Sequence, residues 1–93
     1  MATAPEKKYR QNQSVAWREI GGEAVLVDSR GGKLLVLNPT GSFLWKEIES
    51  PQTLSQLAGA LAGAFEVNLE TASADVGGFL KTLEERRLVE CLP

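Results

Sequence analysis

The hydrophobic positions of the chain change their spacing near Pro39. Before it, short apolar runs are separated by turn residues: Gly21-Gly22 predicts a tight hairpin, and residues 29–32 predict a second, longer turn. After it, apolar residues recur every three or four positions, which is the spacing of one helix face. The pattern therefore predicts a three-stranded antiparallel meander over residues 15–38, followed by three helices.

Residues that favour helix N-caps stand at the start of each helical pattern. Thr40 is the candidate cap of the first helix and Asn68 that of the third. Thr53 opens the second, and Gln56 three residues later completes a capping-box pattern. We expect the apolar faces to share one core, made of Leu37, Leu44, Trp45, Leu57, Leu61, Val76 and Leu80.

The third predicted strand, Leu34 to Leu37, is apolar at every position. A strand with one face in water would alternate apolar and polar residues instead. We therefore expect something to cover the second face or the edge of this strand.

Three helices on one face of a small sheet make an α+β, winged-helix-like domain. The length of 93 residues suits one domain, which we assign to residues 15–93. Residues 1–14 are polar, with Tyr9 as the one large apolar anchor, and are expected to form a flexible arm. The alternative is a basic arm that meets a partner or pairs with a second copy of the chain.

Gly77-Gly78 conflicts with its surroundings, because glycine within a helix costs about 1 kcal/mol relative to alanine. One explanation is close approach by another backbone, or simply tolerated weakness. The other is a hinge, or a place where a bound peptide lies close to the third helix. The sequence leaves both open.

The composition argues against catalysis. The chain has no histidine and a single cysteine, Cys91, so a Cys–His pair or a zinc site cannot form, and we expect no catalytic residue, no metal and no cofactor. A net charge of -2 opposes sequence-independent binding of nucleic acid. No apolar run is long enough to cross a membrane. The lone cysteine and the absence of a signal peptide lead us to expect a cytoplasmic protein.

One block joins the third strand to the first helix: Leu37-Asn38-Pro39-Thr40-Gly41-Ser42-Phe43-Leu44-Trp45. It resembles the signature of the PqqD family, and later apolar positions extend the resemblance over most of the chain. Members of that family are small peptide chaperones, also called recognition elements of RiPPs (ribosomally synthesised and post-translationally modified peptides). The chain departs from the family pattern at Glu49-Ser50 and at Arg87, where members often carry glycine.

The resemblance implies that the leader of a precursor peptide adds as a strand along the third strand and packs beside the third helix. The residues that it assigns to peptide binding are Leu34, Leu35, Val36, Leu37, Asp75, Phe79, Thr82 and Arg86. Phe79 and Leu35 have the alternative of being plain core residues. The implied partners are the precursor peptide and a radical-SAM or other modifying enzyme, as in pyrroloquinoline quinone biosynthesis.

Two other functions compete with peptide binding. The first is a winged helix that binds nucleic acid, against which the acidic balance and the mixed charge of the third helix count. The second is a plain interaction domain, which forms a homodimer by exchanging strands through an exposed sheet edge.

Overall fold

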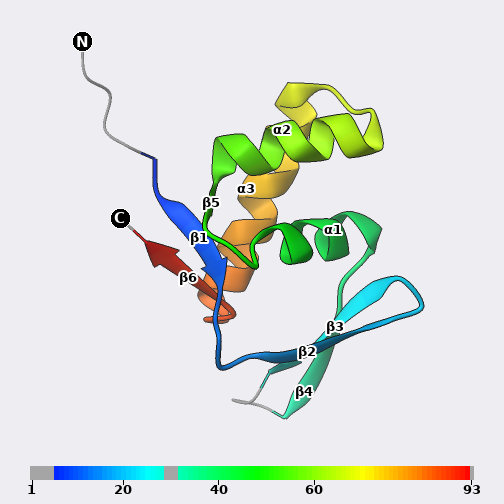
Figure 1. Ribbon diagram of the computed structural model, residues 1–93, viewed down its shortest axis with the longest axis vertical. Coiled ribbons are helices and arrows are strands. Elements are labelled where there is room, and N and C mark those ends of the chain that lie inside the picture. The colour runs from blue at the N-terminus through cyan, green and yellow to red at the C-terminus, as the bar shows by residue number, and fades with distance from the viewer. Residues whose placement is uncertain (1–5, 29–31, 93) are drawn as a thin grey trace.

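The computed structural model describes residues 6–28 and 32–92, which form two small antiparallel sheets and three helices (Figure 1). The first sheet is the predicted meander, in the order β2 (Ala16–Ile20), β3 (Glu23–Asp28) and β4 (Lys33–Val36). β4 pairs with β3 alone, so it is an edge strand among the described residues. The predicted α+β, winged-helix-like fold with a three-stranded meander is confirmed.

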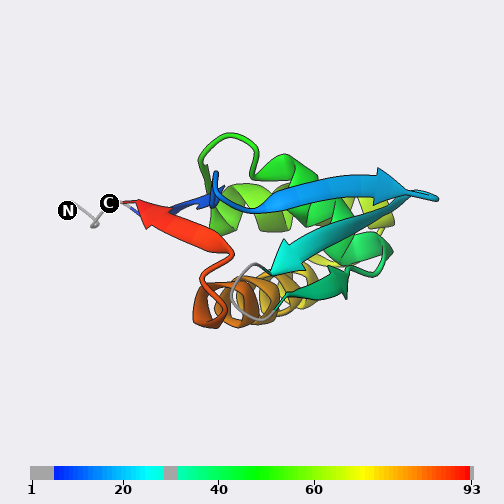
Figure 2. The ribbon, with the colours of Figure 1, turned by 90° about the horizontal axis from the view of Figure 1, so that it is seen from below.

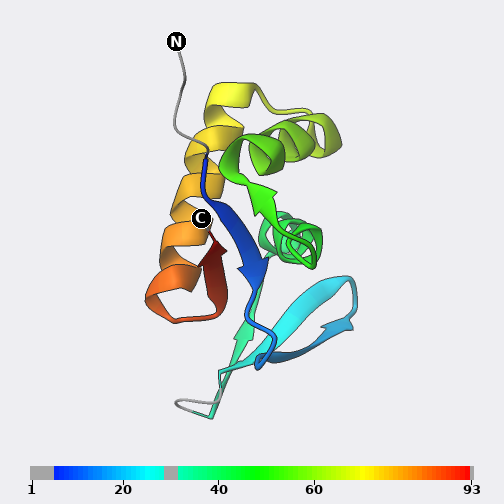
Figure 3. The ribbon, with the colours of Figure 1, turned by 60° about the vertical axis from the view of Figure 1, so that its left-hand side comes forward.

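A second sheet, which the sequence analysis did not predict, consists of β5 (Gln52–Thr53), β1 (Lys8–Gln11) and β6 (Val89–Leu92), with β1 in the centre. Figures 2 and 3 show it as a separate sheet to one side of the meander. The expectation of a flexible arm is therefore wrong for residues 8–11. Their backbone pairs on both sides, Tyr9 packs against the core, and Arg10 forms a 2.6 Å ion pair with Glu90.

The helices are α1 (Pro39–Glu47), α2 (Leu54–Phe65) and α3 (Leu69–Glu85). The predicted capping box at Thr53 and the predicted cap at Asn68 are confirmed. The prediction of Thr40 as the cap of α1 is wrong. Asn38 holds that position, and Pro39 is the first helical residue, where its fixed φ and missing N–H are tolerated.

The core lies between the helices and one face of the meander. Every residue predicted for it is buried, which confirms the core assignment: Leu37, Leu44, Trp45, Leu57, Leu61, Val76 and Leu80. Trp45 is fully buried and meets Trp17 of β2 edge-on, with ring centroids 6.1 Å apart. This contact fixes α1 against the meander and so sets where β4 lies relative to α3.

Candidate functional site: the groove between β4 and α3

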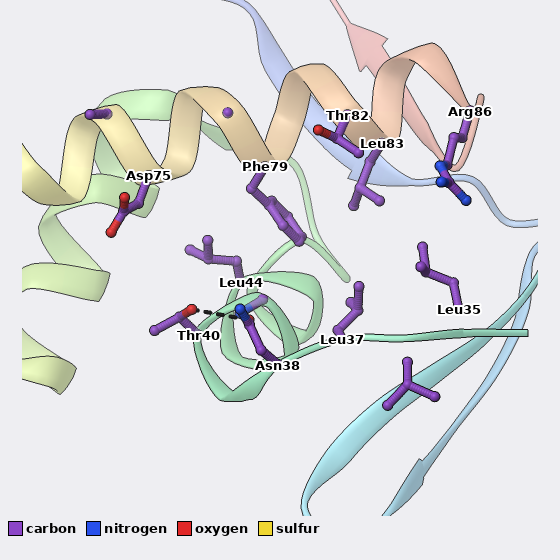
Figure 4. A pocket seen from close by; sticks show the side chains of 14 residues that line it. Leu35, Leu37, Asn38, Thr40, Leu44, Asp75, Phe79, Thr82, Leu83 and Arg86 are labelled. Atoms are coloured by element: carbon purple, nitrogen blue, oxygen red, sulfur yellow. Dashed lines mark hydrogen bonds between the residues drawn. The ribbon is translucent and has the colours of Figure 1, made fainter.

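A groove of about 710 Å³ separates β4 from α3 (Figure 4). We call it the β4–α3 groove. Its deepest lining residues, Leu37, Leu44 and Leu83, are buried core residues. Its remaining lining comes from β4, from the start of α1 and from one face of α3: Leu35, Val36, Asn38, Thr40, Gly41, Ala74, Asp75, Gly78, Phe79, Thr82 and Arg86.

The register of β4 decides which of its backbone groups are free. The N–H of Leu37 donates to the carbonyl of Ala24 at 2.9 Å, so Leu37 points its backbone groups toward β3. In an antiparallel pair this orientation alternates along the strand. The N–H and C=O groups of Leu34 and Val36 therefore point away from β3, toward the open edge. β4 thus offers unpaired donors and acceptors along its edge.

Ser42 holds the junction of β4 and α1 in place. Its hydroxyl is buried, donates to the carbonyl of Leu37 at 3.1 Å and accepts from the N–H of Ala24 at 2.8 Å. The hydroxyl thus bridges β3 and β4 just where the two strands separate. Because both of its hydrogen bonds are satisfied in the interior, it fixes the angle at which α1 leaves the edge strand.

The wall formed by α3 follows from helical spacing. Asp75, Phe79, Thr82 and Arg86 are three or four residues apart and so share one face of the helix. Phe79 is half-buried and packs against the core while its ring lines the groove. Leu35 does the same from β4, so for both residues core packing and groove lining go together.

Gly78 leaves part of this wall bare. A Cβ built there meets no atom within 4 Å, and the same is true of Gly77. Close approach by another backbone segment of the described residues therefore does not explain the glycine pair. Only Gly78 of the two lines the groove.

Opposite charges stand at the two ends of the groove. Figure 4 shows Asp75 at the end near Thr40, and Arg86 at the end near Leu35. Both side chains are exposed, and within residues 6–28 and 32–92 neither has a hydrogen-bonding or ionic partner. The groove therefore has a negatively charged end at Asp75 and a positively charged end at Arg86.

All the predicted site residues except Leu34 line the groove. Leu34 is 67% exposed, and because side chains alternate along a strand it lies on the opposite face from Leu35. The prediction did not include Asn38, Thr40, Gly41, Leu44, Ala74, Gly78 or Leu83. Helical spacing from Asp75 and Phe79 was a signal for Gly78 and Leu83, and Ala74 lies one turn before Gly78. The α1 residues depended on the strand-to-helix turn.

The described part of the chain contains no group of three or more Cys, Asp, Glu or His side chains positioned to hold a metal ion. Among the same residues, no helix is both long and apolar enough to span a bilayer.

An unpaired sheet edge beside a partly apolar, helix-lined groove is the geometry on which extended peptides add as strands. The chain belongs to the PqqD family, whose sequence model, described as coenzyme PQQ synthesis protein D, matches residues 23–89. No curated protein matches the chain in sequence.

Three solved structures share the fold. TbiB1 in complex with the TbiA(beta) leader peptide is 25% identical, with a TM-score of 0.78 over 87% of this chain and 94% of that one. Lasso peptide synthetase B1, complexed with the leader peptide, is 22% identical, with a TM-score of 0.74 over 91% and 98%. The PqqD part of Methylobacterium extorquens PqqCD, described as a stand-alone RiPP recognition element, is 21% identical, with a TM-score of 0.73 over 89% and 88%.

Proposed function

We propose that this protein holds the leader of a ribosomal precursor peptide in extended form along the open edge of β4 and presents it to a modifying enzyme. The observation that carries the proposal is the unpaired edge at Leu34 and Val36, which opens beside the β4–α3 groove. Membership of the PqqD family supports it, as do the leader peptides named in the complexes of TbiB1 and of lasso peptide synthetase B1.

The two parts of the site have different tasks in this proposal. The edge of β4 supplies backbone hydrogen bonds, which contribute affinity whatever the peptide sequence. The groove receives alternate side chains of the added strand against Leu35, Leu37 and Phe79, and so contributes specificity. Leu34 takes part through its backbone, while its side chain lies on the opposite face of the sheet.

The partner that receives the peptide is, in this proposal, a radical-SAM or other peptide-modifying enzyme. The family description connects such proteins with the synthesis of coenzyme PQQ. The chain has Ser50 and Arg87 where family members often carry glycine, which weakens an assignment to PQQ synthesis itself and leaves another peptide pathway open.

Amide chemical-shift mapping during titration with leader peptides from neighbouring precursor genes tests the proposal. We expect shifts at residues 33–38 and along the groove face of α3. Val36→Pro removes an N–H that points to the open edge and should weaken binding strongly. Val36→Ala is the matched control, because it shortens the side chain and keeps the N–H. Phe79→Ala tests the groove and should cost on the order of 1–2 kcal/mol of binding free energy.

Shifts confined to β2 and α2, with β4 and α3 unmoved, would contradict the proposal. Equal affinities for Val36→Pro and the parent protein would contradict the strand-addition geometry. Sedimentation of the same samples separates peptide binding from an exchange of β4 between two copies. Only the exchange doubles the number of protein chains in the sedimenting particle.

A further inference from the structure

The β4–α3 groove combines an apolar centre with one free charge at each end. Asp75 in α3 and Arg86, which caps the C-terminus of α3, lie on the same side of the helix but eleven positions apart in the sequence. At about 1.5 Å per helical residue their backbones are about 16 Å apart along the helix axis. Between them lie Phe79 and the bare surface at Gly78.

Within residues 6–28 and 32–92, no charge neutralises either end. The two ion pairs of the described residues, Arg10–Glu90 and Lys46–Glu19, involve neither Asp75 nor Arg86. Asp28 lines an adjoining pocket of about 180 Å³ together with Arg86, but no ion pair joins the two, and Asp28 has another interaction. Both end charges are therefore available to a ligand.

The direction of β4 decides which of the two charges the N-terminal part of an added peptide strand meets. Figures 2 and 4 show β4 running opposite to α3, so that Leu35 lies near Arg86 and the end of the strand lies toward Asp75. Antiparallel addition is slightly the more stable pairing. A strand added in that direction runs from the Asp75 end to the Arg86 end, and so meets the acidic side chain first.

We propose that the groove selects extended segments that carry a basic residue N-terminal to an acidic one, with large apolar side chains on the same face between them. An extended chain rises about 3.3 Å per residue, so about 16 Å corresponds to about five residues, and the two charges on one face are four or six positions apart. The inference rests on the proposed function and specifies its substrate class.

Selection from a display library of random peptides tests it, with the parent protein and the exchanged variant Asp75→Lys/Arg86→Glu as targets. The parent should enrich basic-before-acidic sequences, and the exchanged variant should enrich the reverse order. Both substituted side chains are exposed, and thermal unfolding by circular dichroism checks that the fold is kept.

The enriched consensus peptide and an isomer with its two charges exchanged are then titrated against the parent, the exchanged variant and the neutral variant Asp75→Asn/Arg86→Gln. We expect the parent to prefer the consensus roughly 10-fold at low salt, since each exposed pair contributes modestly. The exchanged variant should reverse this preference, and the neutral variant should lose it. High salt should reduce the preference, because exposed charges are screened.

The outcomes separate the two proposals. One result would overturn this inference and leave the proposed function in place. In it, Val36→Pro abolishes the enrichment, but the enriched peptides show no order of charges and the exchanged variant enriches the same peptides. An acidic-before-basic consensus would overturn the antiparallel direction. No enrichment by the parent over Val36→Pro would overturn the proposed function, and this inference with it.

Discussion

The side-chain oxygen of Asn38 accepts a hydrogen bond from the backbone N–H of Gly41 at 2.7 Å, and a Cβ on Gly41 would lie 3.0 Å from that same oxygen. A side chain three positions after this cap would therefore crowd the Asn38 oxygen, which would have to shift by a few tenths of an ångström. The same Cβ would lie 3.5 Å from the ring of Phe79, which is an ordinary van der Waals distance, so Gly41 faces the α3 wall of the groove directly. One local turn therefore sets the start of α1 and also contributes Asn38 and Gly41 to the lining of the β4–α3 groove.

The first prediction concerns this cap. Asn38→Ala should lower the free energy of unfolding by about 1 kcal/mol, because the N–H of Gly41 loses its acceptor. Asn68→Ala is the matched control, since Asn68 caps α3 through the N–H of Thr71 at 2.7 Å and does not line the groove. Urea unfolding should give similar losses for the two variants, while only Asn38→Ala should also weaken peptide binding. Equal binding by both variants would show that the cap does not shape the site.

The second prediction concerns the core. Leu57 and Leu80 are 1% and 2% exposed, and replacing either with alanine should cost about 2–5 kcal/mol of stability through lost burial and a residual cavity. Leu69→Ala is the control, because Leu69 is 58% exposed and should change stability little. Denaturation that shows less than half of the expected loss at both core sites would refute the core assignment.

The third prediction separates the two glycines of α3. Alanine at Gly77 or at Gly78 should stabilise the helix by about 1 kcal/mol, because neither new Cβ meets an atom within 4 Å. Leucine at Gly78 should in addition fill part of the groove and weaken peptide binding, whereas leucine at Gly77 should not. Thermal unfolding and peptide titration of the four variants measure both effects. Equal binding by the two leucine variants would leave the glycine pair as tolerated helix weakness.

The fourth prediction tests the position of β1. Tyr9 is the only tyrosine of the chain, so its absorbance at alkaline pH reports on this residue alone. Burial raises the pKa of its phenol above the usual 10.0, and the negative charges of Cys91 and Glu84 add to the rise. A mobile arm would leave the pKa at its ordinary value. The folded protein should therefore titrate at higher pH than the same protein in denaturant.

The same pKa shift has a consequence for stability. Between 10.0 and the raised pKa, the folded state holds the phenol proton more tightly than the unfolded state does. The stabilisation is therefore complete below pH 10.0 and declines as the pH rises through the folded pKa. Tyr9→Phe removes the ionisable group, so its stability should decline less over this range. Identical alkaline profiles for the two proteins would contradict the burial of Tyr9.

Local sequence determined most of the meander and the helices. The glycine pair at Gly21-Gly22, the helical spacing after Pro39 and the capping residues Thr53 and Asn68 act within a few positions of themselves, so a sequence pattern suffices to predict them. The run of apolar residues at Leu34 to Leu37 likewise indicated a strand whose edge or second face is not covered by the sheet itself, and β4 is an edge strand among the described residues. The assignment of the cap to Thr40 failed because Asn38 and Thr40 are both capping residues, and the preference of proline for the first helical position, which favours Asn38, was not used.

Tertiary structure alone decided the remaining features, because they join residues far apart in the chain. β1 is a polar four-residue segment that becomes a strand only because β6, more than seventy positions later, pairs with it. The Ser42 bridge requires β3, β4 and α1 to meet. The pairing of β4 with β3 turns the backbone of Val36 toward the open edge. The opposite charges at Asp75 and Arg86 were visible in the sequence, but their positions at the two ends of one groove follow from the packing of α3 beside β4.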